Sequence, residues 1–153
     1  LQKKIKIFFI GGFQLQQKKL IETLYTKMKI ESELEIIGYD KRELKEIFEN
    51  IDLLIMATKT FEGFGLTILE ALNNGVPVIS SKLGIATELF NETPNYLYDP
   101  GNVDELSEKL NEFLISDDKS IPQSTIKKLK KYDIKNIVKS YRNLMISEYF
   151  KKE

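Results

Sequence analysis

Two glutamates that stand eight positions apart, Glu62 and Glu70, are the residues whose types and spacing most clearly indicate chemistry. Gly63 and Gly65 lie between them, where the sequence predicts that a helix begins. The first N–H groups of a helix have no acceptor within it and bind anions, so two carboxylates and these N–H groups can converge on one small polar ligand. We interpret this segment as a nucleotide-sugar site.

Glu70 is the more informative of the two acids. It lies in a predicted helix among Leu66, Ile68, Leu69, Ala71 and Leu72, which we expect to be largely buried against a sheet. A carboxylate there requires hydrogen-bond donors, and vicinal hydroxyls of a ribose can each donate to one of its oxygens. For Glu62 a simpler interpretation stays open, because an acid also favours a helix N-terminus.

Composition excludes several kinds of chemistry. The 153 residues contain neither Cys nor His, which excludes a thiol nucleophile and a Cys-based zinc site and removes the commonest general base. No metal ligands are evident, so we expect no metal. Lys+Arg and Asp+Glu are equal at 23 each, so no net field recruits nucleic acid. The segment 119–153 is nevertheless basic, with ten Lys/Arg against three acids, which points weakly to an anionic surface.

Apolar runs alternate with helical patterns along the chain, as in a parallel sheet covered by helices. The sequence predicts one α/β domain over 1–153, with strands at 5–10, 34–37, 53–57, 76–80 and 96–98. Helices are expected at 16–28, 41–49, 86–90, 103–115 and 134–150. A further helix is expected after Gly65, and Gly75 and Pro77 end it. Leu20, Leu24 and Met28 form the apolar face of the first helix. We expect core packing to bury most of the apolar stripe of 134–150.

The carboxyl ends of the predicted strands carry small and polar residues. In open α/β sheets ligands bind beyond these ends, which here are Gly11-Gly12, Gly38-Tyr39, Thr58-Lys59 and Ser80-Ser81. Small residues let a ligand approach the backbone closely. Glycines at such positions are also common in ordinary turns, and that alternative stays open for Gly11, Gly12 and Gly38.

The pattern as a whole resembles a known family. Glu62-Gly63-Phe64-Gly65-Leu66 is followed by Leu69-Glu70-Ala71-Leu72, Gly75, Pro77-Val78-Ile79 and Ser81-x-x-Gly84-x-x-x-Glu88. This arrangement resembles the C-terminal, donor-binding domain of retaining GT-B glycosyltransferases, specifically glycosyltransferase family 4 (group 1). The resemblance covers nearly the whole chain and implies a Rossmann-like parallel sheet of about five strands with helices on both faces.

The resemblance also implies roles for single residues. Glu62 matches the family's first glutamate, beside the reacting sugar, and Glu70 the second, which holds the ribose hydroxyls. The backbone of Gly63, Phe64, Gly65, Leu66 and Thr67 matches the segment that contacts sugar and diphosphate. Gly38-Tyr39 matches the nucleobase contact, and Gly11-Gly12 falls near the donor pocket. The implied cofactor set is empty, because the nucleotide-diphosphate sugar is itself the donor substrate.

The sequence departs from the family pattern in its basic residues. The usual Gly-Arg pair that neutralises the diphosphate is missing. Two alignments with the family stay open. In the first, strand 5–10 corresponds to the family's second strand. In the other, it replaces the family's first strand, and Lys18 or Lys19 then supplies the positive charge of the missing Gly-Arg pair. Lys59 and Lys82 are further candidates, and for both a solvated surface role is favoured.

The resemblance further implies an N-terminal acceptor domain that this chain does not contain. We therefore expect the chain to be the donor-binding part of an enzyme that glycosylates a polysaccharide or glycolipid, and to be inactive in isolation. The alternative is a non-catalytic nucleotide-sugar-binding or assembly subunit. The apolar stripe of the helix 134–150 is a candidate surface for contact with the missing acceptor domain. The basic face of the same helix is a candidate surface for contact with anionic lipid. The expected location is cytoplasmic, with peripheral contact at the inner face of the membrane.

Overall fold

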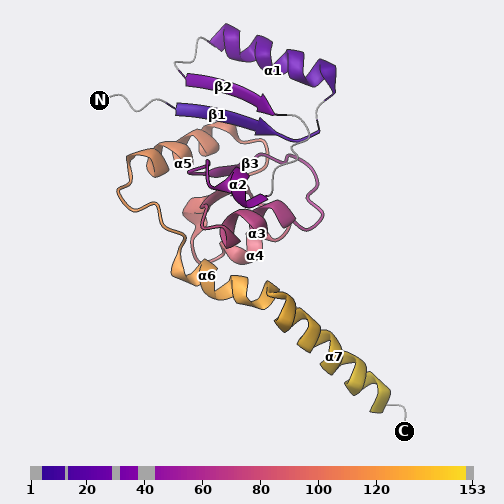
Figure 1. Cartoon of the computed structure of the whole chain (residues 1–153). Coiled ribbons are helices and arrows are strands. Elements are labelled where there is room, and N and C mark those ends of the chain that lie inside the picture. The colour runs from indigo at the N-terminus through magenta and orange to yellow at the C-terminus, as the bar shows by residue number, and fades with distance from the viewer. Residues whose placement is uncertain (1–4, 13, 29–31, 38–43, 151–153) are drawn as a thin grey trace. The chain divides into compact units, whose positions relative to one another are not determined.

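The computed structural model describes residues 5–12, 14–28, 32–37 and 44–150, with backbone only for 44, 45 and 147–150. The chain divides into two compact units, Leu1–Glu43 and Leu44–Glu153. Figure 1 labels their helices and strands. Each unit is described by itself below, and the prediction of a single domain over 1–153 stays a prediction.

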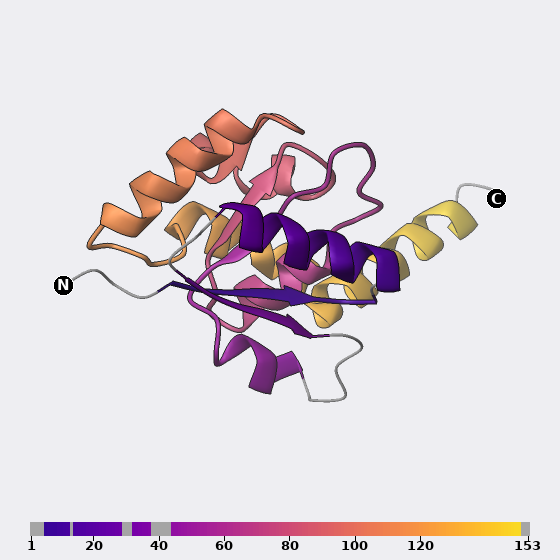
Figure 2. The ribbon, with the colours of Figure 1, turned by 90° about the horizontal axis from the view of Figure 1, so that it is seen from above.

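The first unit contains two parallel strands and one helix. Strand β1 (Ile5–Ile10) pairs with β2 (Ser32–Ile37) in register from Ile5 opposite Ser32 to Ile10 opposite Ile37. Helix α1 (Leu15–Met28) connects the two strands (Figure 2). The predicted apolar face of α1 is present but is not buried within this unit, since Leu20, Leu24 and Met28 are 46–67% exposed.

The second unit is built on three parallel strands in the order β3-β4-β5. Their bounds are Leu54–Met56, Val78–Ser81 and Leu97–Tyr98. The central strand β4 is buried along its whole length. It begins two residues later than predicted, after Pro77, which has no N–H to donate. The Pro77 carbonyl still accepts the Leu54 N–H at 3.0 Å.

Six α-helices surround these strands in the part of this unit that the structure describes. They are α2 (Leu44–Phe48), α3 (Leu66–Asn73), α4 (Ala86–Leu89), α5 (Val103–Ile115), α6 (Gln123–Leu129) and α7 (Ile134–Phe150). Two short 3₁₀ turns, η1 (Pro94–Tyr96) and η2 (Lys130–Tyr132), precede β5 and α7. Two predicted boundaries are confirmed: Gly75 follows α3 in a left-handed conformation (φ +80°), and the Asn102 side chain caps α5 by accepting the Glu105 N–H.

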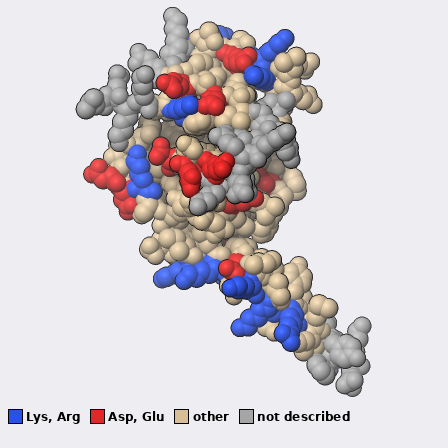
Figure 3. Space-filling view, viewed as in Figure 1, with Lys and Arg blue, Asp and Glu red and all other residues tan. Residues whose placement is uncertain are grey.

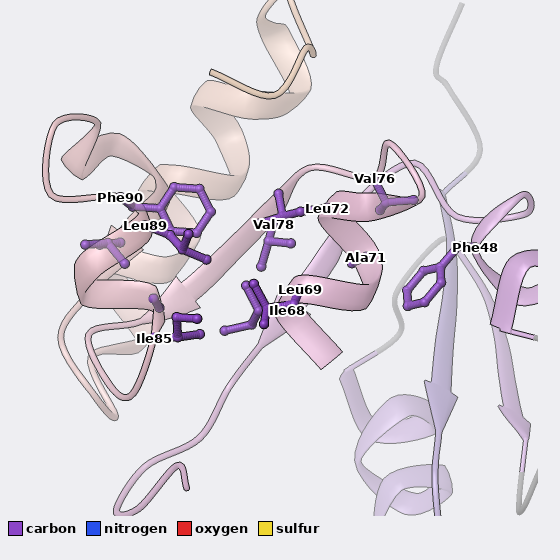
Figure 4. Close-up of a cluster of buried hydrophobic side chains, with 12 residues drawn as sticks. Phe48, Ile68, Leu69, Ala71, Leu72, Val76, Val78, Ile85, Leu89 and Phe90 are labelled. Carbon is purple, nitrogen blue, oxygen red and sulfur yellow. The ribbon is translucent and has the colours of Figure 1, made fainter. Parts of the chain in front are cut away.

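The core of the second unit lies between β4 and helices α3, α4 and α6. Ile68, Val78, Leu89 and Phe90 are completely buried in it (Figure 4). Helix α6 closes this core, because the buried Thr125 hydroxyl donates to the Leu89 carbonyl at 3.3 Å. This contact fixes α6 against α4. Because the Gly84-Ile85 turn leads directly into α4, the contact also links α6 to that turn.

The last helix has the predicted bounds, but the expectation that its stripe is buried is wrong. Ile134, Val138, Tyr141 and Met145 are 58–70% exposed. The reason is geometric, since α7 leaves the core directly after η2 and extends away from the rest of its unit (Figure 1). None of the described helices combines the length and the apolar character that are needed to cross a bilayer.

The predicted α/β class is confirmed, with parallel strands and intervening helices. The five strands found in the described residues are the five predicted ones, and they pair as one set of two and one set of three. The carboxyl ends of β3, β4 and β5 share one edge of the second sheet because the strands are parallel. The segment from Glu62 to Glu70 begins just beyond that edge.

Candidate functional site

The segment after β3 folds as a loop that ends at a left-handed glycine and opens α3. Gly65 is buried, has φ +95°, and places its carbonyl to accept the N–H groups of Ile68 (3.0 Å) and Leu69 (3.4 Å). The N–H groups of Leu66 and Thr67 have no backbone acceptor among the described residues. The predicted helix start is confirmed, and its free N–H groups form the positive end of the α3 dipole.

Close backbone packing explains why this loop needs glycine at Gly65 and why Gly84 faces it. A Cβ on Gly65 would lie 2.9 Å from Ile85 Cγ2, and one on Gly84 would lie 3.0 Å from Glu62 Cγ. The Ile85 N–H donates to the Phe64 carbonyl at 3.1 Å, which ties the loop to the turn before α4. The two glycines therefore allow contact between segments that would otherwise be held apart.

Glu62 is half-buried and is held from the end of β3. The Thr58 hydroxyl donates to Glu62 Oε2 at 3.3 Å. The sequence placed Thr58 at a strand end, but it gave no sign of this hydrogen bond. Glu62 is therefore positioned by three segments, namely the β3 end, its own loop and the turn at Gly84.

Glu70 lies one helical turn after Leu66, on the outward face of α3. The inward face carries the buried Ile68, Leu69, Ala71 and Leu72, whereas Leu66 is 63% exposed and Glu70 is half-buried. The expectation that this helix is largely buried is thus confirmed for Ile68, Leu69, Ala71 and Leu72 but is wrong for Leu66. Helical side chains tilt toward the N-terminus, so the Glu70 side chain is expected to lean toward the first turn of α3.

The Glu70 carboxylate has no hydrogen bond or ion pair with any of the residues that the structure describes. Its backbone carbonyl, by contrast, accepts from both the N–H and the Nδ2 of Asn74. A half-buried carboxylate without a partner among the described residues is available for a ligand that carries donors, such as hydroxyl groups.

The basic residues proposed to replace the missing Gly-Arg pair differ in their environments. Lys82 is already paired with Asp99 (2.7 Å) and Glu105 (3.5 Å), and the hydrogen bond to Asp99 is the main reason that its pKa is raised. Two carboxylates neutralise its charge, which leaves little for a diphosphate. Lys59 is exposed beyond β3, and Lys18 and Lys19 are exposed on α1 in the first unit.

The remaining predicted site residues are distributed over both units. Gly11 and Gly12 follow β1 in the first unit, where the Gly11 N–H donates to the Ile37 carbonyl at 3.2 Å. Gly38 and Tyr39 lie outside the described residues. The structure brings together Glu62, Gly63, Phe64, Gly65, Leu66, Thr67 and Glu70 in one continuous segment of the second unit.

Sequence reasoning missed one residue at this site. The Tyr132 ring from η2 meets the Phe64 ring edge-on, with centroids 5.9 Å apart and an interplanar angle of 68°. The two residues are 68 positions apart, and no motif joins them. Only the path of α6 and η2 over the core brings Tyr132 to the loop.

The candidate site of this α/β protein combines a helix N-terminus, a positioned glutamate and a carboxylate without a partner among the described residues. Such groups can bind a ligand that is anionic and rich in hydroxyl groups. Sequence comparison identifies the family. The family described as "Glycosyl transferases group 1" matches residues 1–140, and the chain belongs to it.

Characterised relatives share this segment at moderate identity. The chain is 35% identical over 132 residues to a sucrose synthase from Melioribacter roseus, covering 82% of this chain and 16% of the relative. Protein CapJ from Staphylococcus aureus is 32% identical over 92% of this chain and 32% of its own length. The O-antigen biosynthesis glycosyltransferase WclY from Escherichia coli is 32% identical over 60% of this chain and 26% of its own length. The chain thus spans a third or less of these proteins.

Solved structures confirm the fold. A glycosyltransferase from Rickettsia africae superposes with a TM-score of 0.75 at 21% identity, covering 99% of this chain and 41% of that one. HepE from Anabaena, solved in complex with UDP and glucose, gives a TM-score of 0.64 at 23% identity, covering 95% of this chain and 40% of that one. The neighbours are GT-B glycosyltransferases, so the chain has the fold of part of such an enzyme.

Proposed function

We propose that this chain is the donor-binding domain of a retaining glycosyltransferase, which transfers a sugar from a nucleotide-diphosphate sugar to a polysaccharide or glycolipid acceptor. One observation carries the proposal: on the outward face of α3, Glu70 has no side-chain partner among the described residues, and the N–H groups that open the same helix are free. Hydroxyl groups and phosphate are the ligand groups that complement these two features.

Each residue has a proposed role. Glu70 accepts hydrogen bonds from the ribose hydroxyls, and the N–H groups of Leu66 and Thr67 donate to the diphosphate, whose charge the α3 dipole also stabilises. Glu62, held by Thr58 at 3.3 Å, lies beside the sugar and stabilises positive charge at the reacting carbon in an oxocarbenium-like transition state. The bond between the sugar carbon and the diphosphate breaks, and the diphosphate leaves with the bonding electron pair. The acceptor hydroxyl oxygen forms the new bond to that carbon, and its proton passes to the departing diphosphate.

The family resemblance assigns two further roles to residues of the first unit in this proposal: Gly11 and Gly12 near the donor, and Gly38-Tyr39 at the nucleobase. We propose that no metal takes part, because helix N–H groups and a lysine offset the charge of the leaving group. Lys59, Lys18 and Lys19 are the candidates for that lysine, since the charge of Lys82 is already neutralised.

Transfer requires a second half, and α7 supplies a surface for it. The relatives are three to six times longer than the segment they share with this chain. The exposed apolar side chains of α7, such as Val138 and Met145, complement an apolar face of an acceptor domain. We therefore expect the chain alone to bind a donor weakly and to transfer no sugar.

Basic side chains border the apolar face of α7. Lys135, Lys139 and Arg142 follow one another at helical spacing, and no acidic residue occurs between 134 and 147. Figure 3 shows Lys and Arg gathered along this helix. We propose that they contact anionic lipid at the inner face of the membrane, consistent with a cytoplasmic enzyme that glycosylates a lipid-linked acceptor.

Calorimetric titration with UDP, GDP and ADP, and with their glucose conjugates, tests the proposal. UDP-glucose is the first probe because HepE was solved with UDP and glucose. Glu70→Ala should weaken binding about 10- to 100-fold, as expected for the loss of hydrogen bonds to a charged group. Glu108→Ala is the matched control, because Glu108 is an exposed glutamate on α5. EDTA should not change the affinity.

Two outcomes would overturn the assignment. If none of these nucleotides binds, the chain is not a donor-binding domain. If Glu70→Ala binds as tightly as Glu108→Ala does, Glu70 does not hold the ribose. Binding that persists without transfer, even after the acceptor half is supplied, would favour the alternative of a non-catalytic nucleotide-sugar-binding subunit.

A further inference from the structure

The connection between α6 and α7 touches the loop that contains Glu62. Tyr132 ends the η2 turn, and its half-buried ring packs against the core cluster and edge-on against Phe64. Phe64 is itself 48% exposed, so its ring is only partly packed against the protein. The contact therefore fixes a side chain in the middle of the Gly63-Phe64-Gly65 turn.

Glu88 fixes Tyr132 in turn. The Tyr132 hydroxyl interacts with the Glu88 carboxylate, and Lys131 Nζ lies 3.4 Å from Glu88 Oε1. Burial, followed by the interaction with Glu88, raises the pKa of Tyr132 to about 12. Glu88 lies on α4, directly after the Gly84-Ile85 turn that binds the Phe64 carbonyl. Both the ring and the backbone of Phe64 are thus held by the same part of the fold.

The same connection sets the start of α7. Asp133 follows Tyr132, and its Oδ1 accepts the Lys135 N–H at 2.8 Å while its carbonyl accepts the Ile137 N–H at 3.0 Å. These hydrogen bonds cap the first turn of α7 one residue away from the Tyr132 ring. A displacement of α7 must therefore act on the residue that packs against Phe64.

We propose that Tyr132 is a positioning residue that holds the Glu62–Gly65 loop and couples its conformation to the placement of α7. The proposal rests on the proposed function only in its consequence for donor binding, because the contact exists without a ligand. Removing the ring should release Phe64. With it should move the Glu62 carboxylate on one side and the N–H groups of Leu66 and Thr67 on the other. Removing only the hydroxyl should keep the ring contact and change little.

Three variants separate this role from a general loss of packing. Tyr132→Ala removes the ring, and Tyr132→Phe keeps it. Tyr96→Ala is the matched control, because Tyr96 is also a half-buried tyrosine that packs on the same core, but its ring stacks on Phe90, 5.6 Å away, and its hydroxyl donates to Ser120. All three should retain the circular dichroism of the folded chain.

Amide NMR spectra of the chain without nucleotide provide the first measurement. Tyr132→Ala should shift or broaden the Gly63 and Gly65 signals, Tyr132→Phe should largely restore them, and Tyr96→Ala should leave them unchanged. Gly63 and Gly65 signals that are the same in Tyr132→Ala as in the wild type would overturn the proposal. So would equal changes in the Tyr96→Ala control, because the effect would then be general destabilisation.

Titration with UDP-glucose provides the second measurement. Tyr132→Ala should weaken binding about 2- to 12-fold, the range of an edge-to-face aromatic pair, and this loss should disappear in a Phe64→Leu background. An equal loss in that background would show that Tyr132 does not act through Phe64. If the wild type binds no nucleotide while the glycine signals still respond to Tyr132→Ala, the donor assignment fails and the positioning role stands.

Discussion

Gly65 makes the most demanding conformational contribution to the site, and its replacement by alanine has a calculable cost. At φ +95° an L-residue is strained by about 1–2 kcal/mol. The new Cβ would also lie 2.9 Å from Ile85 Cγ2 and 3.3 Å from Ile68 Cδ1. Both side chains are buried and cannot turn away freely, so overpacking adds about 1–3 kcal/mol. We expect Gly65→Ala to lower the free energy of unfolding by about 2–5 kcal/mol.

Gly75→Ala separates the two contributions. Gly75 has a similar conformation (φ +80°), but a Cβ there would meet nothing within 4 Å. It should therefore cost only the backbone strain, about 1–2 kcal/mol. Urea denaturation followed by circular dichroism measures both variants, and with an ordinary slope the midpoint of Gly65→Ala should be about 1 M below that of Gly75→Ala. If the two free energies of unfolding agree within about 0.5 kcal/mol, the loop does not pack against the Ile85 turn as described.

Three further outcomes follow from the second unit. Phe90→Ala should lower the free energy of unfolding by about 3–5 kcal/mol in thermal melts, because the ring is fully buried, and a cost below 2 kcal/mol would contradict its place in the core. Lys82→Met should change the free energy of unfolding little in urea titrations, and less still in salt, because the pair with Asp99 is solvent-exposed; a large, salt-independent loss would contradict this. In an alkaline absorbance titration, Tyr132→Phe should remove one group that ionises near pH 12. The pKa of Tyr132 in the folded state lies above the unfolded value of 10, so this hydroxyl stabilises the fold fully below pH 10 and progressively less as the pH rises to 12. If Tyr132→Phe leaves the pH dependence of stability between pH 10 and 12 unchanged, the ionisation of Tyr132 is not coupled to folding.

Local signals in the sequence predicted most of the fold. Strand β1 and helices α5 and α7 have the expected bounds, because apolar periodicity and the Asn102 cap are local features. Burial was less predictable. The same periodicity that correctly indicates a buried face in α5 indicated one in α7, where the described chain contains nothing to cover it. A periodic pattern reports that a face is apolar, and not which surface covers it.

In the candidate site too, local features were predictable and contacts between separate segments were not. The helix start at Gly65 followed from glycine chemistry along a single segment. The Thr58 hydrogen bond to Glu62 and the Tyr132 contact with Phe64 did not, because both depend on how separate segments pack. The neutralisation of Lys82 by Asp99 and Glu105 was equally hidden, since the partners follow a different strand.

The hydrogen bond between Thr125 and Leu89 has a consequence for synthesis of the chain on the ribosome. All the strands of the second unit and helices α2 to α5 precede α6, yet α6 covers Leu89 and Phe90, which are fully buried only when it is in place. A nascent chain that ends before Thr125 therefore exposes part of the core of this unit to solvent. Emergence of α6 from the ribosome, and not completion of the three-stranded sheet, is the step that completes this core.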